Sequence, residues 1–173
     1  MPGNLSHNGS DSADPPTSSE SRLGVGWVIF QGVMFVFFIV AMVAGERVQS
    51  FTGMVYLQSA GLLLAIFGSG VSIWSVVQHG SRLSPFPKPV DGAVLIESGP
   101  YRFVRHPMYS GIIAFVLGAS VAYMVPAAML AAPAFLVFFM AKTGHEELLL
   151  ADAVPGYRAY RSSVHWKLIP KVI

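Results

Sequence analysis

Residues 23–44 read LGVGWVIFQGVMFVFFIVAMVA, a run of 22 residues that contains no charged side chain. A helix needs about 20 consecutive apolar residues to cross the hydrocarbon core of a bilayer. This run therefore predicts a transmembrane helix over residues 23–44. Residues 54–77 form a second uncharged run, of 24 residues, and predict a second span.

The composition of the whole chain agrees with a membrane protein. Of its 173 residues, 53% are hydrophobic and only 12% are charged, whereas soluble domains carry roughly 25% charged residues. So few charges are explained if lipid covers much of the surface. Ahead of the first span, the sequence is rich in Ser, Pro, Asn and Gly. This composition predicts a disordered tail over residues 1–22, followed by one membrane domain over residues 23–173.

A third uncharged run, of 33 residues over 109–141, is too long for one span and contains Pro126. We interpret it as a hairpin with arms over about 109–125 and 127–141, each near the lower length limit for a crossing. The chain is thus predicted to be an all-α integral membrane protein with about four transmembrane helices. The polar segment after the hairpin predicts a separate amphipathic helix near residues 143–152.

Lysine and arginine residues are distributed unevenly between the two sides of this four-span topology. Of the 11, only Arg47 falls outside the N-terminal tail, the 78–107 insert and the C-terminal region. Basic residues next to membrane spans favour the cytoplasmic side. We therefore expect an inner or plasma membrane protein whose two termini and insert lie in the cytoplasm.

Side chains suited to chemistry gather in two segments, residues 97–111 and 142–147. The first ends where the third span begins, and the second begins where the fourth span ends, so a hairpin brings the two together. Ionisable groups at a membrane boundary are costly unless they are paired. We therefore expect contacts between the Arg and His residues of the first segment and the Glu pair of the second. Such a set suits a zwitterionic ligand that also carries a diol and a planar base.

Each of these residues also has a simpler interpretation. Arg and His before a span often only anchor it at the head groups, and Tyr and Trp there form an aromatic belt. Two glutamates at a helix start can complement the helix dipole. We interpret His79, His145 and His165 as ordinary surface residues. The chain has no cysteine, a net charge of only +2 and no metal-ligand spacing, so we expect no metal and no nucleic acid.

Four sequence elements together are more specific than any one of them. They are Gly99-Pro-Tyr-Arg-Phe-Val-Arg-His-Pro-Met-Tyr-Ser-Gly111, Glu146-Glu147, Pro155-Gly-Tyr-Arg-Ala-Tyr160 and Trp166-Lys-Leu-Ile-Pro170. This pattern resembles the isoprenylcysteine carboxyl methyltransferase family and its phospholipid methyltransferase relatives, over about residues 78–170. The resemblance implies a membrane methyltransferase that uses S-adenosylmethionine. It also implies a non-Rossmann cofactor pocket, made by the cytoplasmic insert and the C-terminal helix, and a lipophilic acceptor that arrives from the bilayer.

The resemblance further assigns roles to single residues. It implies cofactor contacts for Leu95, Ile96, Tyr101, His106, Pro107, Met108, Tyr109, Glu146 and Glu147. Lys142 stands where the family usually has an arginine associated with the acceptor. Because lysine cannot clamp a carboxylate bidentately, this difference weakens a carboxylate acceptor. Arg105 is a candidate either for holding the junction together or for orienting the acceptor.

Two other functions stay open at this point. Sterol-reductase-like membrane proteins share a similar C-terminal architecture and an R-H-P-like element but use NADPH. The present chain is short for that class, and Met108 stands where its pattern has Asn. The third possibility is a non-enzymatic protein whose junction only anchors the spans. The acceptor is also open: a prenylated cysteine carboxylate, a phospholipid amine, a quinone or isoprenoid precursor, or a small thiol.

Overall fold

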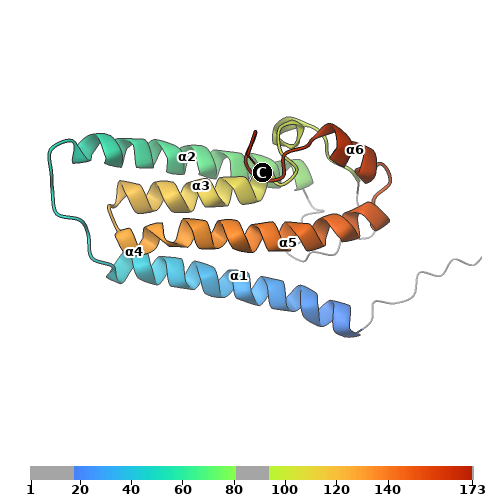
Figure 1. Cartoon of the computed structure of the whole chain (residues 1–173), viewed down its shortest axis with the longest axis horizontal. Helices are drawn as coiled ribbons and strands as arrows, with labels where there is room; N and C mark the ends of the chain where they lie inside the picture. Colours follow the sequence, from blue (N-terminus) through green and yellow to red (C-terminus); the bar gives the residue numbers. More distant parts are fainter. Residues whose placement is uncertain (1–17, 81–93, 173) are drawn as a thin grey trace, which may run out of the picture.

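A computed structural model of the chain describes residues 18–80 and 94–172. Every regular element within these ranges is a helix, and none is a strand, which confirms the all-α prediction. Four long helices lie side by side (Figure 1). They are α1 (Ser18–Ala44), α2 (Met54–His79), α3 (Pro107–Ala122) and α5 (Ala131–Ala153). Most of the predicted tail and residues 81–93 of the predicted insert lie outside the described residues.

Three shorter helices complete the fold. They are the 3-10 helix η2 (Gly99–Arg102), α4 (Pro126–Met129) and α6 (Tyr157–Ser163). Figure 1 shows α6 at the end of the bundle where α2 and α5 finish and α3 starts. The insert and the C-terminal region therefore meet at one end of the bundle, whereas α4 lies at the other end.

Three helical segments of the described chain are long and apolar enough to cross a membrane. They are Gly24–Ala44, Met54–His79 and Pro126–Ala153. The first two coincide with the runs predicted to span the membrane over 23–44 and 54–77 and, by length and composition, are long and apolar enough to do so. With 16 residues, α3 rises only about 24 Å, less than the roughly 30 Å of a hydrocarbon core. A complete crossing by α3 therefore stays a prediction.

The helix boundaries differ from the predicted ones at three places. Helix α1 already begins at Ser18, within the predicted tail. Helix α3 ends at Ala122, before residue 125. Helix α5 does not end at residue 141 but continues to Ala153, so the separate amphipathic helix over 143–152 was wrong. The reason is that Lys142 and Glu146, one turn apart on α5, are both buried and therefore continue its packed face.

Glycine residues let α2 and α3 pack in close contact. A Cβ atom added to Gly68 would lie 2.6 Å from the carbonyl oxygen of Gly111, and one added to Gly61 would lie 2.8 Å from that of Gly118. Small residues at such positions allow helix backbones to approach closely in lipid. At the end of this contact, the Ser72 hydroxyl donates to the carbonyl of Met108 over 3.0 Å. The first turn of α3 is thus fixed against α2.

Aromatic side chains hold α5 between α3 and α1. The ring of Phe139 in α5 stacks on that of Tyr109 in α3, with 4.3 Å between centroids. On its other side, α5 meets α1 where Phe138 packs against Trp27 at 5.6 Å. These contacts set the rotation of α5, and hence the direction in which its polar residues point.

Candidate functional site

The segment just before α3 is bound to the C-terminal region through its backbone. The amide of Arg105 donates to the carbonyl of Trp166 over 2.9 Å, and that of His106 donates to Lys167 over 3.0 Å. The Ser110 hydroxyl in the first turn of α3 donates to the carbonyl of Leu168. Pro107 begins the helix at a position that needs no amide donor. The C-terminal segment therefore lies across the start of α3.

Arg105 and Glu147 form the centre of the site. The Nε atom of Arg105 lies 2.8 Å from Oε1 of Glu147, and both side chains are buried. The Nη1 atom of Arg105 donates to the carbonyls of Val164 and His165, each over 2.7 Å. Because its Nε and Nη1 donors point to a carboxylate and to the C-terminal backbone, Arg105 ties α5 and the C-terminal segment to the start of α3.

His106 lies between the two adjacent carboxylates. Its Nε2 atom is 3.3 Å from Oε1 of Glu147 and its Nδ1 atom is 3.7 Å from Oε2 of Glu146. The Tyr109 hydroxyl donates to Oε1 of Glu146 over 2.7 Å. The rings of His106 and Tyr109 are nearly parallel, 5.8 Å apart. The Arg, His and Tyr of the first predicted segment thus do contact the Glu pair of the second.

Further cations balance the charge of the two buried glutamates. Oε2 of Glu147 has the side chains of Arg161 at 3.6 Å and Lys167 at 3.9 Å. Oε1 of Glu146 has Lys142 at 3.9 Å. Burying an ion costs several kcal/mol unless partners compensate for its lost hydration. Since this network supplies partners from α3, α5, α6 and the C-terminal segment, its formation depends on all of them.

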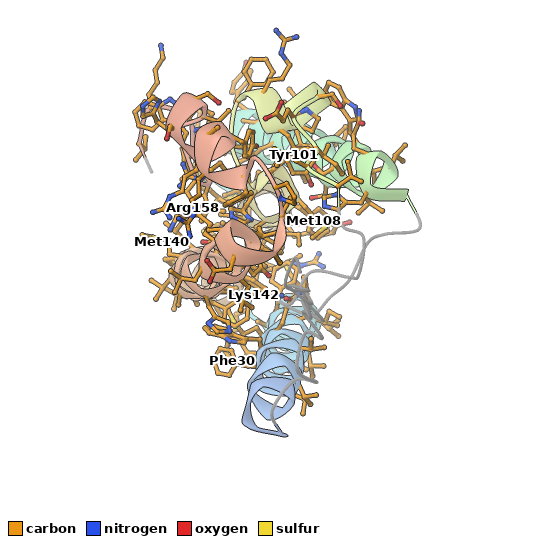
Figure 2. All side chains as sticks on the ribbon, turned by 90° about the vertical axis from the view of Figure 1, so that its right-hand side faces the viewer. Phe30, Tyr101, Met108, Met140, Lys142 and Arg158 are labelled. Carbon is orange, nitrogen blue, oxygen red and sulfur yellow. The ribbon has the colours of Figure 1, made fainter. Side chains whose placement is uncertain are left out.

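Lys142 connects the network to α1, a contact that the sequence did not predict. The side chain is 1% exposed, and its Nζ atom donates to Oε1 of Gln31 over 2.7 Å. Figure 2 looks at the bundle from this end and shows Lys142 where α5 faces α1. The sequence feature that could have indicated this contact is Gln31 itself, the one side-chain amide in the apolar run 23–44.

Tyr101 lies beside the network, packed between α2 and α6. Its hydroxyl is 3.0 Å from Nδ1 of His79, and its carbonyl accepts from the Tyr160 hydroxyl over 2.8 Å. The interpretation of His79 as an ordinary surface residue was therefore wrong, as it was for His145, which is half-buried and stacks on Trp27. His165 is exposed, as predicted.

The remaining predicted residues lie around the network without an ionic role. Pro107 is fully buried, and Met108 is partly buried against the apolar core. Leu95 packs against the buried cluster of Val154, Tyr157 and Tyr160. An open hollow of about 580 Å³ adjoins this cluster and is lined by Gln78, Leu95, Ile96, Glu97, Ser98 and Arg102.

Tyr157 is a second residue that the sequence did not single out. Its side chain is 4% exposed, and its hydroxyl has no hydrogen-bond partner within the described part of the chain. Burial raises the pKa of this phenol, so it stays protonated and able to donate. Buried polar atoms in proteins are nearly always satisfied, so the Tyr157 hydroxyl is an exception among the described residues.

The fold and this network define a helical membrane protein with a buried ionic site at one end. A sequence model of the phospholipid methyltransferase family matches residues 56–153, which is 98 of the 173 residues. The chain belongs to the phospholipid methyltransferase family. Membership implies a methyltransferase that uses S-adenosylmethionine and acts on a lipid acceptor. A comparison with curated proteins gave no significant match.

Proposed function

We propose that this protein transfers a methyl group from S-adenosylmethionine to a lipophilic acceptor at the cytoplasmic face of the membrane. The observation that carries the proposal is the contact of Arg105 and His106 with Glu146 and Glu147 in one buried network. This network lies at the same end of the bundle as the hollow beside Ile96. The family match supports this function over an NADPH-dependent reductase.

The groups at this end of the bundle fit S-adenosylmethionine, which presents an ammonium, a carboxylate and a ribose diol. Oε2 of Glu147 has only the longer ion pairs at 3.6 and 3.9 Å among the described residues, which leaves it able to accept from a ligand. The Tyr157 hydroxyl is a further buried donor. For cofactor binding we therefore propose Leu95, Ile96, Tyr101, His106, Pro107, Met108, Tyr109, Glu146 and Glu147, to which the structure adds Tyr157.

The bound cofactor supplies a methyl group that its sulfonium already activates, so the protein has to position the reactants and exclude water. Well-aligned reactants can lower a barrier by about 7–11 kcal/mol. We assign Arg105 a positioning role, because its Nε and Nη1 atoms are bound to Glu147 and to two backbone carbonyls. Lys142 faces α1 and the bilayer side of the network, which supports a role next to the acceptor.

The cytoplasmic orientation rests on charge. Ten of the 11 lysine and arginine residues lie in the sequence at the start of α1 (Arg22), between α2 and α3, or from residue 142 onward. Figure 1 shows that α1 and α3 begin, and α2 and α5 end, at the end of the bundle that carries α6. Basic residues next to membrane spans favour the cytoplasm. In this topology α3 is the third of four crossings. The acceptor is a phospholipid or, as an alternative, an isoprenylcysteine-like carboxylate or another isoprenoid or thiol.

Calorimetric titration of the full chain in detergent tests the proposed function. We expect binding of S-adenosylmethionine and S-adenosylhomocysteine but not of NADPH. The variant Glu147→Gln keeps an acceptor for Arg105 but loses the charge, and we expect at least a tenfold weaker affinity for the cofactor. Asp152→Asn, which changes an exposed carboxylate paired with Arg158, is the matched control. Binding of NADPH alone, or unchanged affinity in Glu147→Gln, would refute the proposal.

A further inference from the structure

Helix α6 presents two polar side chains to the buried carboxylate of Glu147. Tyr157 and Arg161 are four residues apart on α6, and residues at this spacing lie on the same face of a helix. The Nε atom of Arg161 is 3.6 Å from Oε2 of Glu147. The Tyr157 hydroxyl is close enough to interact electrostatically with both of these charges. One face of α6 therefore brings a phenol and a guanidinium to the network.

The Tyr157 hydroxyl is buried but not satisfied. Only 4% of the residue is exposed, yet no group within residues 18–80 and 94–172 forms a hydrogen bond with this hydroxyl. Tyr160, three residues later, has the carbonyl of Tyr101 as its partner. A buried hydroxyl without a partner is unfavourable, so a bound group that accepts a hydrogen bond from Tyr157 would be stabilised here.

Arg161 also has donors to offer at this place. Its Nε atom lies beyond hydrogen-bond distance of Glu147, and no described residue accepts from its Nη1 or Nη2 atom. The Arg161 side chain is 51% exposed, whereas that of Glu147 is 2% exposed, so the guanidinium extends from the surface toward a buried charge. Lys167 approaches the same oxygen from the C-terminal segment, with its Nζ atom at 3.9 Å.

The charges around Glu147 are not balanced. Arg105, Arg161 and Lys167 all form their ion pairs with this one carboxylate. Three positive charges against one negative charge leave an excess of two among these residues. An anion that accepts hydrogen bonds is therefore favoured beside them. Oε2 of Glu147, which has only the two long ion pairs, can at the same time accept from a cation.

A carboxylate acceptor and an excess of cationic donors thus lie side by side. An α-amino acid is complementary to this arrangement, because its ammonium and its carboxylate are bonded to the same carbon. S-adenosylmethionine carries such a group at one end. We propose that Arg161 and the Tyr157 hydroxyl bind the carboxylate of this amino-acid end, while Oε2 of Glu147 accepts from its ammonium. Lys167 supplies a second cation to the same carboxylate.

This inference rests on the proposed function and adds to it the residues that recognise the amino-acid end of the cofactor. Arg161 is a specificity-determining residue, because a guanidinium binds a carboxylate through two parallel hydrogen bonds. A nucleoside ligand that lacks the carboxylate leaves the excess charge uncompensated and the Tyr157 hydroxyl without an acceptor. The protein should therefore discriminate between two ligands that differ in the carboxylate alone.

Calorimetric titration of the full chain in dodecyl maltoside tests this discrimination. The ligands are S-adenosylhomocysteine and its decarboxylated analogue, which keeps the nucleoside, the sulfur and the ammonium. We expect S-adenosylhomocysteine to bind the parent at least tenfold more tightly. In Arg161→Gln the ratio of the two affinities should fall below threefold, and in Tyr157→Phe it should fall at least twofold. Arg158→Gln, a 78% exposed arginine on the same helix, is the matched control and should keep the parent ratio.

The ratio is measured within one variant, so a general loss of stability affects both ligands alike. Arg161→Lys keeps the charge and should retain a ratio above threefold. Equal affinities in the parent, or a ratio that Arg161→Gln leaves unchanged, would overturn the inference. It would also be overturned if Arg161→Gln bound both ligands more tightly by the same factor, because Arg161 would then only compete with the ammonium for Glu147.

The same titrations separate this inference from the proposed function. If S-adenosylhomocysteine binds the parent but the analogue binds equally well, the inference about Arg161 fails and the proposed function stands. If neither ligand binds the folded parent, the proposed function fails and the inference fails with it.

Discussion

The Nε atom of Arg105 lies 2.8 Å from Oε1 of Glu147, and this ion pair joins residues 42 positions apart in the chain. Both side chains are buried, and the same guanidinium binds the carbonyls of Val164 and His165. One side chain therefore holds together the start of α3, the cytoplasmic end of α5 proposed above and the C-terminal segment. The properties of this contact can be tested separately from catalysis.

Replacing Arg105 with Ala should strongly destabilise the protein. Removing one partner of a buried ion pair costs about 3–5 kcal/mol, because the other charge stays buried and unpaired. The free energy of unfolding in mixed detergent micelles measures the effect. Arg158→Ala removes an exposed pair with Asp152 at 3.1 Å and should change this free energy by less than about 1 kcal/mol. Equal effects of the two substitutions would contradict the assigned role of Arg105.

Replacing Gly68 with Ala should force α2 and α3 apart. The added Cβ would meet the carbonyl of Gly111 at 2.6 Å, and overpacking of this kind costs about 1–3 kcal/mol. At Gly70, two residues further along α2, an added Cβ has nothing within 4 Å. Gly70→Ala should therefore leave the thermal midpoint unchanged or raise it slightly, because Ala favours a helix. A thermal scan of both variants decides whether this close contact holds the helices together.

Two buried tyrosines should respond in opposite ways to loss of the hydroxyl. The hydroxyl of Tyr160 donates to the carbonyl of Tyr101 over 2.8 Å, and burial raises its pKa to about 12, so it remains a donor at neutral pH. Tyr160→Phe should cost about 1 kcal/mol of stability. Tyr157→Phe removes a hydroxyl without a partner in the described structure and should leave the ligand-free protein as stable or more so. Thermal unfolding without ligand makes the comparison, and a larger loss in Tyr157→Phe would disagree with it.

Replacing Tyr109 with Phe separates hydrogen bonding from packing in the site. The substitution removes the donor to Glu146 at 2.7 Å but keeps the ring that stacks on Phe139. A hydrogen bond to a charged group contributes about 1.5–3 kcal/mol, so the unfolding free energy should fall by this amount. The cofactor affinity should fall as well. Tyr123→Phe, at the exposed end of α3, serves as the control and should match the wild type in both measurements.

The first two spans could be predicted because their sequences leave no alternative. In lipid, the backbone N–H and C=O groups of an uncharged run such as 23–44 need partners within the protein. A helix provides them within the one segment. The end of α5 could not be predicted in the same way. Lys142 and Glu147 resemble the polar boundary of a span when only the sequence is read, yet both are inside the protein. A charged residue in a sequence does not show whether its side chain is hydrated at the surface or paired with another group inside the protein.

The candidate site shows the same limit in more detail. The sequence predicted that the segment with Arg105 and His106 would meet Glu146 and Glu147, because a hairpin joins its two ends. It did not predict the carbonyls of Val164 and His165 as partners of Arg105, because every residue has a carbonyl and none is marked in the sequence. The link to Gln31 was missed for another reason: a single amide in an apolar run does not reveal which helix it faces.

The backbone contacts between residues 105–106 and 166–167 have a consequence for biosynthesis. Val164 and His165 follow Arg105 by 59 and 60 positions, so at translation rates of about 5–20 residues per second they emerge roughly 3–12 s later. During this interval α1 and α2 can already enter the membrane, whereas the guanidinium still lacks its carbonyl partners. The nascent chain therefore inserts its first helices before its site can assemble. A ribosome stalled before residue 164 would carry membrane-embedded helices in which Arg105 lacks the carbonyls of Val164 and His165.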